Sequence, residues 1–270
     1  MPTQKEKCET FKALHEAPGA FVIPNPWDEG SARIMQHLGA PALATTSQGF
    51  AQTLGKLDGK VTLEEKLAHC TRLANATDVP INVDFEDGFG IAPERVADHM
   101  RAVIGTGVAG CSIEDWDRER QTMIEHSVAV ERIAAAAEVV ADFDMPFLLT
   151  ARSELILRQA GDLDAAIKRL QAYERAGAQV LYAPGIASVE DLRSLATAVT
   201  RPINLLGVFM PSVTVAEMAQ AGAKRISVGS ALFNRAMAPV LAACREMLDA
   251  GTFAWTSGMT GELQDLISGP

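Results

Sequence analysis

The sequence has no uninterrupted apolar run of about 18 residues, the length that a membrane-spanning helix requires. It also lacks a block of basic residues, and its formal net charge of −10 argues against nucleic acid and anionic membrane surfaces as partners. Its four cysteines are widely spaced and form no CxxC pair, which is typical of reduced thiols in a cytosolic protein. Residues 1–16 are polar and lack the apolar core of a signal peptide, so we expect a cytoplasmic location.

The chain also lacks a low-complexity linker, so we expect one domain over residues 1–270. Short β-branched runs alternate with amphipathic segments roughly every 25 to 35 residues, as βα units require. An open doubly wound sheet would need a Gly-rich turn after its first strand, but residues 25–29 read NPWDE. The sequence therefore predicts an α/β fold, a (β/α)₈ TIM barrel. Its strands are expected at Phe21–Asn25, Ala42–Ser47, Pro80–Glu86, Gly110–Asp115, Phe147–Arg152, Val180–Gly185, Pro202–Gly207 and Arg225–Gly229.

Helices are expected between these strands, where apolar residues recur at helical spacing. Ser188 and Ser212 precede two of them as candidate N-caps, and Gly39, Gly177 and Gly222 follow others as stops. The predicted helices include Leu63–Ala76, Val128–Asp142, Asp162–Ala176, Ser188–Val199, Val213–Ala221 and Leu232–Ala250.

Acidic residues gather at two neighbouring strand ends. Side chains alternate along a strand, so Asp84 and Glu86 are expected to point the same way, and Glu114 ends the next strand. Gathered carboxylates repel one another unless a cation lies among them. Oxygen ligands suit a hard ion, so we predict a Mg²⁺ site, with Mn²⁺ as the alternative.

Other polar residues lie at strand ends, where a barrel carries its active site. The turn Ser47-Gln48-Gly49 offers successive backbone N–H groups for a carboxylate, or is only a turn. Arg152 is suited to clamp a substrate carboxylate, with a counter-ion role for Glu114 or Glu154 as the alternative. Asn25 and Asn204 either line the site or cap the helices that follow.

Two loops add candidates for proton transfer. Asp58 lies in a Gly-bracketed loop that either reaches over the site or is a solvated turn. The polar stretch 116–125 fits a mobile lid that excludes water. His126 follows this stretch and either titrates at the site or has a capping or surface role.

With these motifs in place, the chain resembles the isocitrate lyase/phosphoenolpyruvate mutase superfamily from about residue 21 to about residue 248. The resemblance is carried by NPWDEGSA, TTSQGFAQTLGKLDG, VDFEDGFG, CSIED, LLTARSE, LYAPG and PINLLG. It implies Mg²⁺ held by Asp84, directly or through water, with Glu86 and Glu114 acting through water. It also implies that Ser47, Gly49 and Arg152 hold a 2-oxo acid or its enolate, and that Asp58 is the family's loop aspartate. The family's assemblies imply a homodimer or homotetramer, with exchange of the eighth helix as one arrangement.

The lid segment departs from relatives within that superfamily. Its lyases carry a Lys-Lys-Cys-Gly-His lid, but residues 115–126 contain no Cys and no Lys, which argues against isocitrate or methylisocitrate as substrate. The mutases use Lys and Asn, whereas this lid has Arg118 and Arg120 without Asn. We predict a Mg²⁺-dependent lyase that cleaves a C–C bond in, or decarboxylates, a small 2-oxo or hydroxy dicarboxylate through an enolate. The alternatives are a phosphonopyruvate-type P–C hydrolase or mutase, and a non-catalytic barrel that binds a metal and a dicarboxylate.

Overall fold

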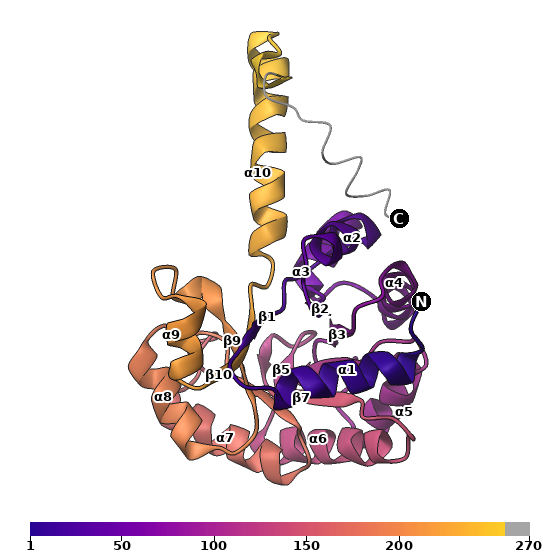
Figure 1. Ribbon diagram of the computed structural model, residues 1–270, viewed down its shortest axis with the longest axis vertical. Coiled ribbons are helices and arrows are strands. Elements are labelled where there is room, and N and C mark those ends of the chain that lie inside the picture. The colour runs from indigo at the N-terminus through magenta and orange to yellow at the C-terminus, as the bar shows by residue number, and fades with distance from the viewer. Residues whose placement is uncertain (257–270) are drawn as a thin grey trace.

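Eight parallel strands curl into a barrel in the computed structural model, which describes residues 1–256 (Figure 1). The hydrogen-bonded order of the strands is β1-β10-β9-β8-β7-β4-β3-β2. The first and last strands of this order, β1 and β2, meet where the amide of Ala44 donates to the Pro24 carbonyl (3.0 Å). The barrel prediction is therefore confirmed. The strands are β1 (Phe21–Val22), β2 (Leu43–Ala44), β3 (Ile81–Asp84), β4 (Gly110–Glu114), β7 (Leu148–Arg152), β8 (Val180–Tyr182), β9 (Ile203–Leu206) and β10 (Ala223–Ser227). A separate antiparallel hairpin pairs β5 (Trp116–Asp117) with β6 (Thr122–Met123).

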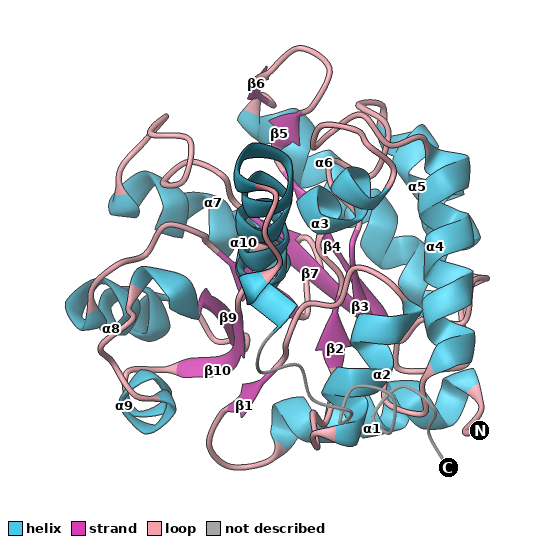
Figure 2. Cartoon of the chain, turned by 90° about the horizontal axis from the view of Figure 1, so that it is seen from above, coloured by secondary structure: helices cyan, strands magenta, loops and turns pink. Residues whose placement is uncertain are grey.

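Helices surround the strands, as the view from above shows (Figure 2). Ser188 caps its helix as predicted, and Gly177 adopts φ 106° at the end of another. The predicted cap Ser212 is wrong, because that helix begins at Val215 and Thr214 accepts the capping hydrogen bond. No described helix is both long and apolar enough to cross a bilayer. The helices are α1 (Gln4–Glu16), α2 (Glu29–His37), α3 (Ser47–Thr53), α4 (Leu63–Ala76), α5 (Pro93–Ile104), α6 (His126–Ala141), α7 (Leu163–Arg175), α8 (Val189–Ala198), α9 (Val215–Gln220) and α10 (Ala231–Arg245), with shorter turns η1 (Gly207–Phe209), η2 (Glu246–Ala250) and η3 (Ala254–Thr256).

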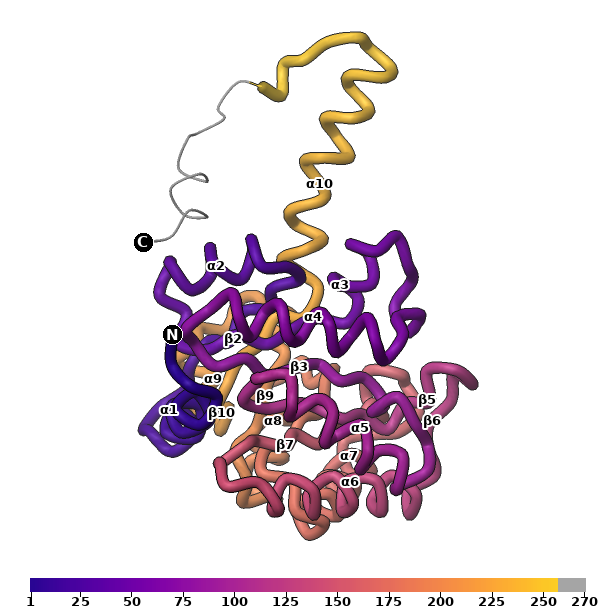
Figure 3. The backbone as a smooth tube through the Cα atoms, turned by 90° about the vertical axis from the view of Figure 1, so that its right-hand side faces the viewer, coloured from indigo at the N-terminus to yellow at the C-terminus, as the bar shows by residue number. Residues whose placement is uncertain are grey.

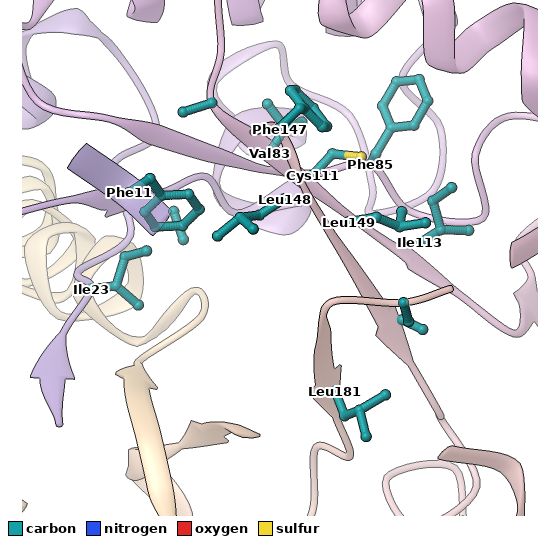
Figure 4. Packing of buried hydrophobic residues seen from close by; sticks show 14 of the residues in the cluster. Phe11, Ile23, Val83, Phe85, Cys111, Ile113, Phe147, Leu148, Leu149 and Leu181 are labelled. Carbon is teal, nitrogen blue, oxygen red and sulfur yellow. The ribbon is translucent and has the colours of Figure 1, made fainter. Parts of the chain in front are cut away.

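The apolar core lies mainly between the strands and the helices. Val83, Cys111, Ile113 and Leu149 are fully buried and belong to this layer (Figure 4). Because side chains alternate along a strand, the residues next to these in the sequence face the barrel interior. These are mostly polar or charged: Asn82, Asp84, Ser112, Glu114, Thr150 and Arg152. The strands therefore build an apolar outside and a polar interior.

The two terminal helices behave differently. Phe11 of α1 is fully buried and reaches the first residue of β4, Gly110, so α1 closes the amino-terminal end of the barrel. The eighth helix, α10, rises away from the rest of the chain (Figures 1 and 3). Phe233 is its only buried residue in the described part of the chain. The barrel is thus closed by α1 at the amino-terminal ends of its strands, and the carboxyl ends remain available for a site.

Candidate functional site

Two cavities meet at Arg152, near the carboxyl ends of the strands. The outer cavity has a volume of ≈ 120 Å³ and the inner cavity, deeper in the barrel, ≈ 40 Å³. The outer cavity brings together Ser47, Asp58, Glu86, Glu114 and Arg152 with Gly59, Trp116, Arg118, Gln121 and Arg158. The inner cavity is lined by Asn25, Ala44, Thr45, Asn82, Asp84, Ser112, Arg152, Tyr182, Asn204, Arg225, Ser227 and Gly229.

Asp84 is the last residue of β3 and faces the inner cavity. Its Oδ2 accepts a hydrogen bond from the Ser47 amide (3.1 Å), and its Oδ1 lies 3.8 Å from Arg152 Nη1. Burial opposes ionisation of this carboxyl, but Arg152 and the ammonium of Lys66 outweigh it and lower the pKa of Asp84. Asp84 is therefore held as a carboxylate.

Glu86 does not continue the strand. The strand was expected to reach residue 86, but β3 ends at Asp84 and Glu86 adopts φ 52°, the left-handed region that non-glycine residues rarely occupy. Its Oε1 lies 3.1 Å from Lys66 Nζ, and its Oε2 lies 3.0 Å from Arg118 Nη1. Strand alternation thus fails for this pair, and Glu86 lines the outer cavity while Asp84 lines the inner one.

Lys66 is a site residue that the sequence analysis missed. It lies on α4 and its side chain is fully buried, with Nζ also donating to the Asp84 carbonyl (3.1 Å). A signal was present, since Lys66 shares the inward stripe of α4 with Cys70 and Leu73. A buried ammonium requires a buried anion, and Glu86 provides it.

Arg152, at the end of β7, is held by two carboxylates. Its Nη1 lies 3.3 Å from Glu114 Oε2, and its Nε lies 2.5 Å from Glu154 Oε1. Burial raises the pKa of Glu114 well above its usual value; Arg152 lowers it, while the carboxylates of Glu154, Asp84 and Glu86 act in the same direction as burial. The counter-ion role considered for Arg152 is therefore present, and the guanidinium remains exposed to both cavities.

Of the carboxylates that were predicted to hold a metal, Asp84 lines the inner cavity, whereas Glu86 and Glu114 line the outer one. Among residues 1–256, no group of three or more His, Cys, Asp or Glu side chains is arranged to hold a metal ion by itself. The donors are nevertheless oxygen atoms, and after burial, the main cause, the nearby carboxylates also raise the pKa of Glu114. Such a set fits a hard cation bound by Asp84 and reached by Glu86 and Glu114 through water.

The predicted anion-binding turn forms the start of α3. Thr46 caps this helix and accepts the Gly49 amide (3.3 Å), while the Ser47 amide is bonded to Asp84. Gln48 Oε1 accepts a hydrogen bond from Ser230 Oγ (2.9 Å), which ties α3 to the loop after β10. Ser47 lines the outer cavity, whereas Gln48 and Gly49 line neither cavity.

The predicted lid is the β5–β6 hairpin, and it lies over the site. Arg118, in the hairpin loop, binds Glu86 and donates to the Val61 carbonyl (3.0 Å), and it contacts Gly59 beside Asp58. Asp58 lines the outer cavity, so its loop does reach the site. His126 is exposed at the first position of α6 and lines neither cavity.

Asn25 and Asn204 lie in the inner cavity and support the barrel. Asn25 donates to the Thr45 carbonyl (3.1 Å) and accepts from the amides of Val228 (2.8 Å) and Gly229 (3.0 Å), which joins β1 to both neighbours. Asn204 accepts from Arg225 Nε (2.8 Å) and donates to Ser227 Oγ (3.0 Å). Neither caps a helix.

Comparisons with known proteins agree with this fold. A family model described as phosphoenolpyruvate phosphomutase matches residues 11–248. The 2-methylisocitrate lyase of Escherichia coli (strain K12) is 33% identical over 204 residues, which cover 72% of this chain and 68% of that protein. A crystal structure from Burkholderia cenocepacia J2315, with the general description lyase/mutase, has 41% identity and a TM-score of 0.93 and covers 99% of this chain and 97% of that one. The structure of oxaloacetate acetylhydrolase with its product oxalate has 25% identity and a TM-score of 0.87, over 98% of this chain and 94% of that one.

Proposed function

The chain belongs to the phosphoenolpyruvate phosphomutase family, within the isocitrate lyase/PEP mutase superfamily of enzymes, and on that premise we propose a Mg²⁺-dependent lyase for small 2-oxo or hydroxy dicarboxylates. The observation that carries the proposal is the grouping of Asp84, Glu86 and Glu114 around Arg152 at one end of the barrel. This arrangement puts an oxygen-rich donor set beside a fixed cation, which suits a doubly charged oxo acid.

Each residue has a separate part in the reaction. Arg152 binds and orients a substrate carboxylate, because Glu114 and Glu154 fix its guanidinium. A divalent cation held by Asp84, with Glu86 and Glu114 acting through water, would stabilise negative charge on the 2-oxo oxygen. In a decarboxylation the C–C bond breaks, CO₂ leaves and the electron pair stays as the enolate, which then takes a proton on carbon. Asp58 is the proposed proton donor because it lines the outer cavity, whereas the exposed His126 does not.

One observation favours phosphonate chemistry as a second candidate. The guanidinium groups of Arg118, Arg152 and Arg158 line the outer cavity together. Three cations suit a phosphoryl group as well as a carboxylate, because guanidinium binds both in a bidentate manner. Phosphonopyruvate is therefore the competing substrate.

Turnover assays separate these candidates. We would incubate the protein and Mg²⁺ with oxaloacetate, 2-methylisocitrate or phosphonopyruvate, and measure pyruvate, oxalate and phosphate. Pyruvate from oxaloacetate that EDTA abolishes, above a control without protein, is the expected result. Phosphate from phosphonopyruvate would transfer the assignment to P–C chemistry, and no product from any substrate would contradict the proposal.

The substitution Asp84→Asn tests the assignment of the cation. We expect it to weaken Mg²⁺ binding and to lower kcat/KM by roughly 100-fold or more, as removal of a carboxylate that supports transition-state charge does. Asp98→Asn is the matched control, because Asp98 is exposed on α5 and pairs with Arg101. Isothermal titration with Mg²⁺ and initial rates give the two readouts, and unchanged Mg²⁺ affinity in Asp84→Asn would refute the role of this residue.

A further inference from the structure

Arg225 is a buried cation in the barrel interior that has only neutral partners. Its side chain, on β10, donates from Nε to Asn204 Oδ1 (2.8 Å), from Nη1 to Asn82 Oδ1 (3.3 Å) and from Nη2 to Thr150 Oγ1 (2.9 Å). Within residues 1–256 it forms no ion pair with a carboxylate. Burial lowers the pKa of Arg225 to about 9, which reflects this uncompensated position.

This arrangement is incomplete as a structural network. Arg is almost never fully buried unless it is paired, because desolvation of its charge is costly. A guanidinium has five N–H groups, and the three hydrogen bonds to neutral acceptors in the described chain leave two. Arg225 lines the inner cavity, so an anion in that space is within reach of the guanidinium.

The inner cavity has the size and charge for a carboxylate. Arg225 and Arg152 both line it, and its only lining carboxylate in the described chain is Asp84, which already accepts the Ser47 amide and faces Arg152. Its volume of ≈ 40 Å³ corresponds to about three water-sized positions at ~10–15 Å³ each, which matches the three heavy atoms of a carboxylate. The remaining polar lining, including Ser227 and Tyr182, can orient such a group.

We propose that the inner cavity is an anion subsite in which Arg225, together with Arg152, binds one carboxylate of the substrate. The proposal rests on the function proposed above and deepens it, because a second cation at this depth selects dicarboxylates over monocarboxylates. The substrate then spans the two cavities, with its reacting carbons beside Asp84 and Arg152. Arg225 acts here as a specificity-determining residue.

Binding of a dianion and a monoanion tests the subsite. Isothermal titration with malonate and with pyruvate, in the presence of Mg²⁺, compares the wild type with Arg225→Met and Arg225→Lys. We expect Arg225→Met to weaken malonate binding at least about tenfold with less than about a twofold change for pyruvate, and Arg225→Lys to recover part of the loss. Lys224→Met is the matched control, because Lys224 is adjacent but bonds to the Ala17 and Gly19 carbonyls outside the cavity.

A second variant keeps the test independent of the folding of Arg225→Met. Ser227→Asp puts a carboxylate into the cavity beside Arg225, so it should abolish malonate binding while pyruvate still binds. Equal losses for both ligands, or no loss of malonate binding in either variant, would overturn the subsite. If malonate binding depends on Arg225 but no 2-oxo acid is turned over, the proposed reaction fails and the subsite remains. If 2-oxo acids are turned over but Arg225→Met leaves the preference for malonate over pyruvate unchanged, the proposed reaction stands and the subsite fails.

Discussion

His69 lies flat against Phe50 under the candidate site. The two rings are stacked at 3.7 Å with an interplanar angle of 5°, and His69 Nε2 lies 3.0 Å from the Trp27 carbonyl. The imidazole is fully buried, and burial together with the nearby Lys66 ammonium lowers the pKa of His69 to about 3. The folded protein therefore holds this ring in its neutral form.

This single residue predicts acid sensitivity. The unfolded chain binds a proton at His69 near pH 6.5, whereas the folded chain does so only near pH 3. The contribution of His69 to the free energy of unfolding is therefore fully present above pH 6.5. It decreases as the pH falls from 6.5 toward 3, by up to ~1.4 kcal/mol per pH unit. The free energy of unfolding, measured by urea titration between pH 4 and 7, should depend less steeply on pH in His69→Gln than in the wild type. The difference in slope should correspond to at most one bound proton. Identical slopes in the two proteins would contradict the prediction.

The predictability of the site also differs residue by residue. The positions of Asp84, Glu114 and Arg152 on one rim could be predicted because each ends an apolar strand, and the carboxyl ends of parallel barrel strands lie together. Lys66 and Arg225 were missed because their roles depend on partners far along the chain, such as Glu86 for Lys66. A cation on a buried stripe signals a buried partner but does not say which one.

At the scale of elements, the β5–β6 hairpin depends on a few polar contacts. The sequence predicted a mobile polar lid, but the segment pairs Trp116 with Met123, and Asp117 accepts the amides of Glu119 (2.9 Å) and Arg120 (2.8 Å) in the turn. Because charged and polar residues dominate it, composition alone does not distinguish a loop from such a hairpin. Regular elements such as α8, with its Ser188 cap, were easier to predict because their signals are local.

Arg118 is the contact that should hold this hairpin over the site. Its guanidinium joins the hairpin to Glu86 and to the Val61 carbonyl, and hydrogen bonds to charged groups contribute ~1.5–3 kcal/mol. We expect Arg118→Gln to accelerate amide exchange of residues 116–125 by about tenfold or more, measured by hydrogen–deuterium exchange mass spectrometry. Arg120→Gln is the control, because the Arg120 side chain is 78% exposed. Equal exchange in the two variants would exclude this anchoring role.

At the scale of the whole molecule, α10 packs on the barrel through Phe233, and the rest of the helix leaves large apolar side chains uncovered by the described residues 1–256. Large side chains on it are exposed, namely Met237 (39%), Val240 (47%) and Leu241 (56%), and Leu248 (84%) follows in η2. Their spacing of three, four and seven residues places them on one side of the helix. A stripe of this kind on a helix that leaves the body is typical of an interface, since exposed apolar patches mark association sites.

We therefore expect a second copy of the chain to cover α10, giving the homodimer or homotetramer predicted from the sequence. Light scattering coupled to size exclusion should give a multiple of the monomer mass for the wild type. Leu241→Glu should shift the protein to a smaller species, because a buried unpaired charge in an interface is costly. Leu38→Glu is the matched control, because Leu38 is 70% exposed after α2 on the barrel body, and its mass should stay that of the wild type. A monomeric wild type, or equal behaviour of the two variants, would rule out α10 as the interface.

Exchange of α10 between subunits, as distinct from simple packing, would in addition require α10 of one copy to cross-link to the barrel of the other.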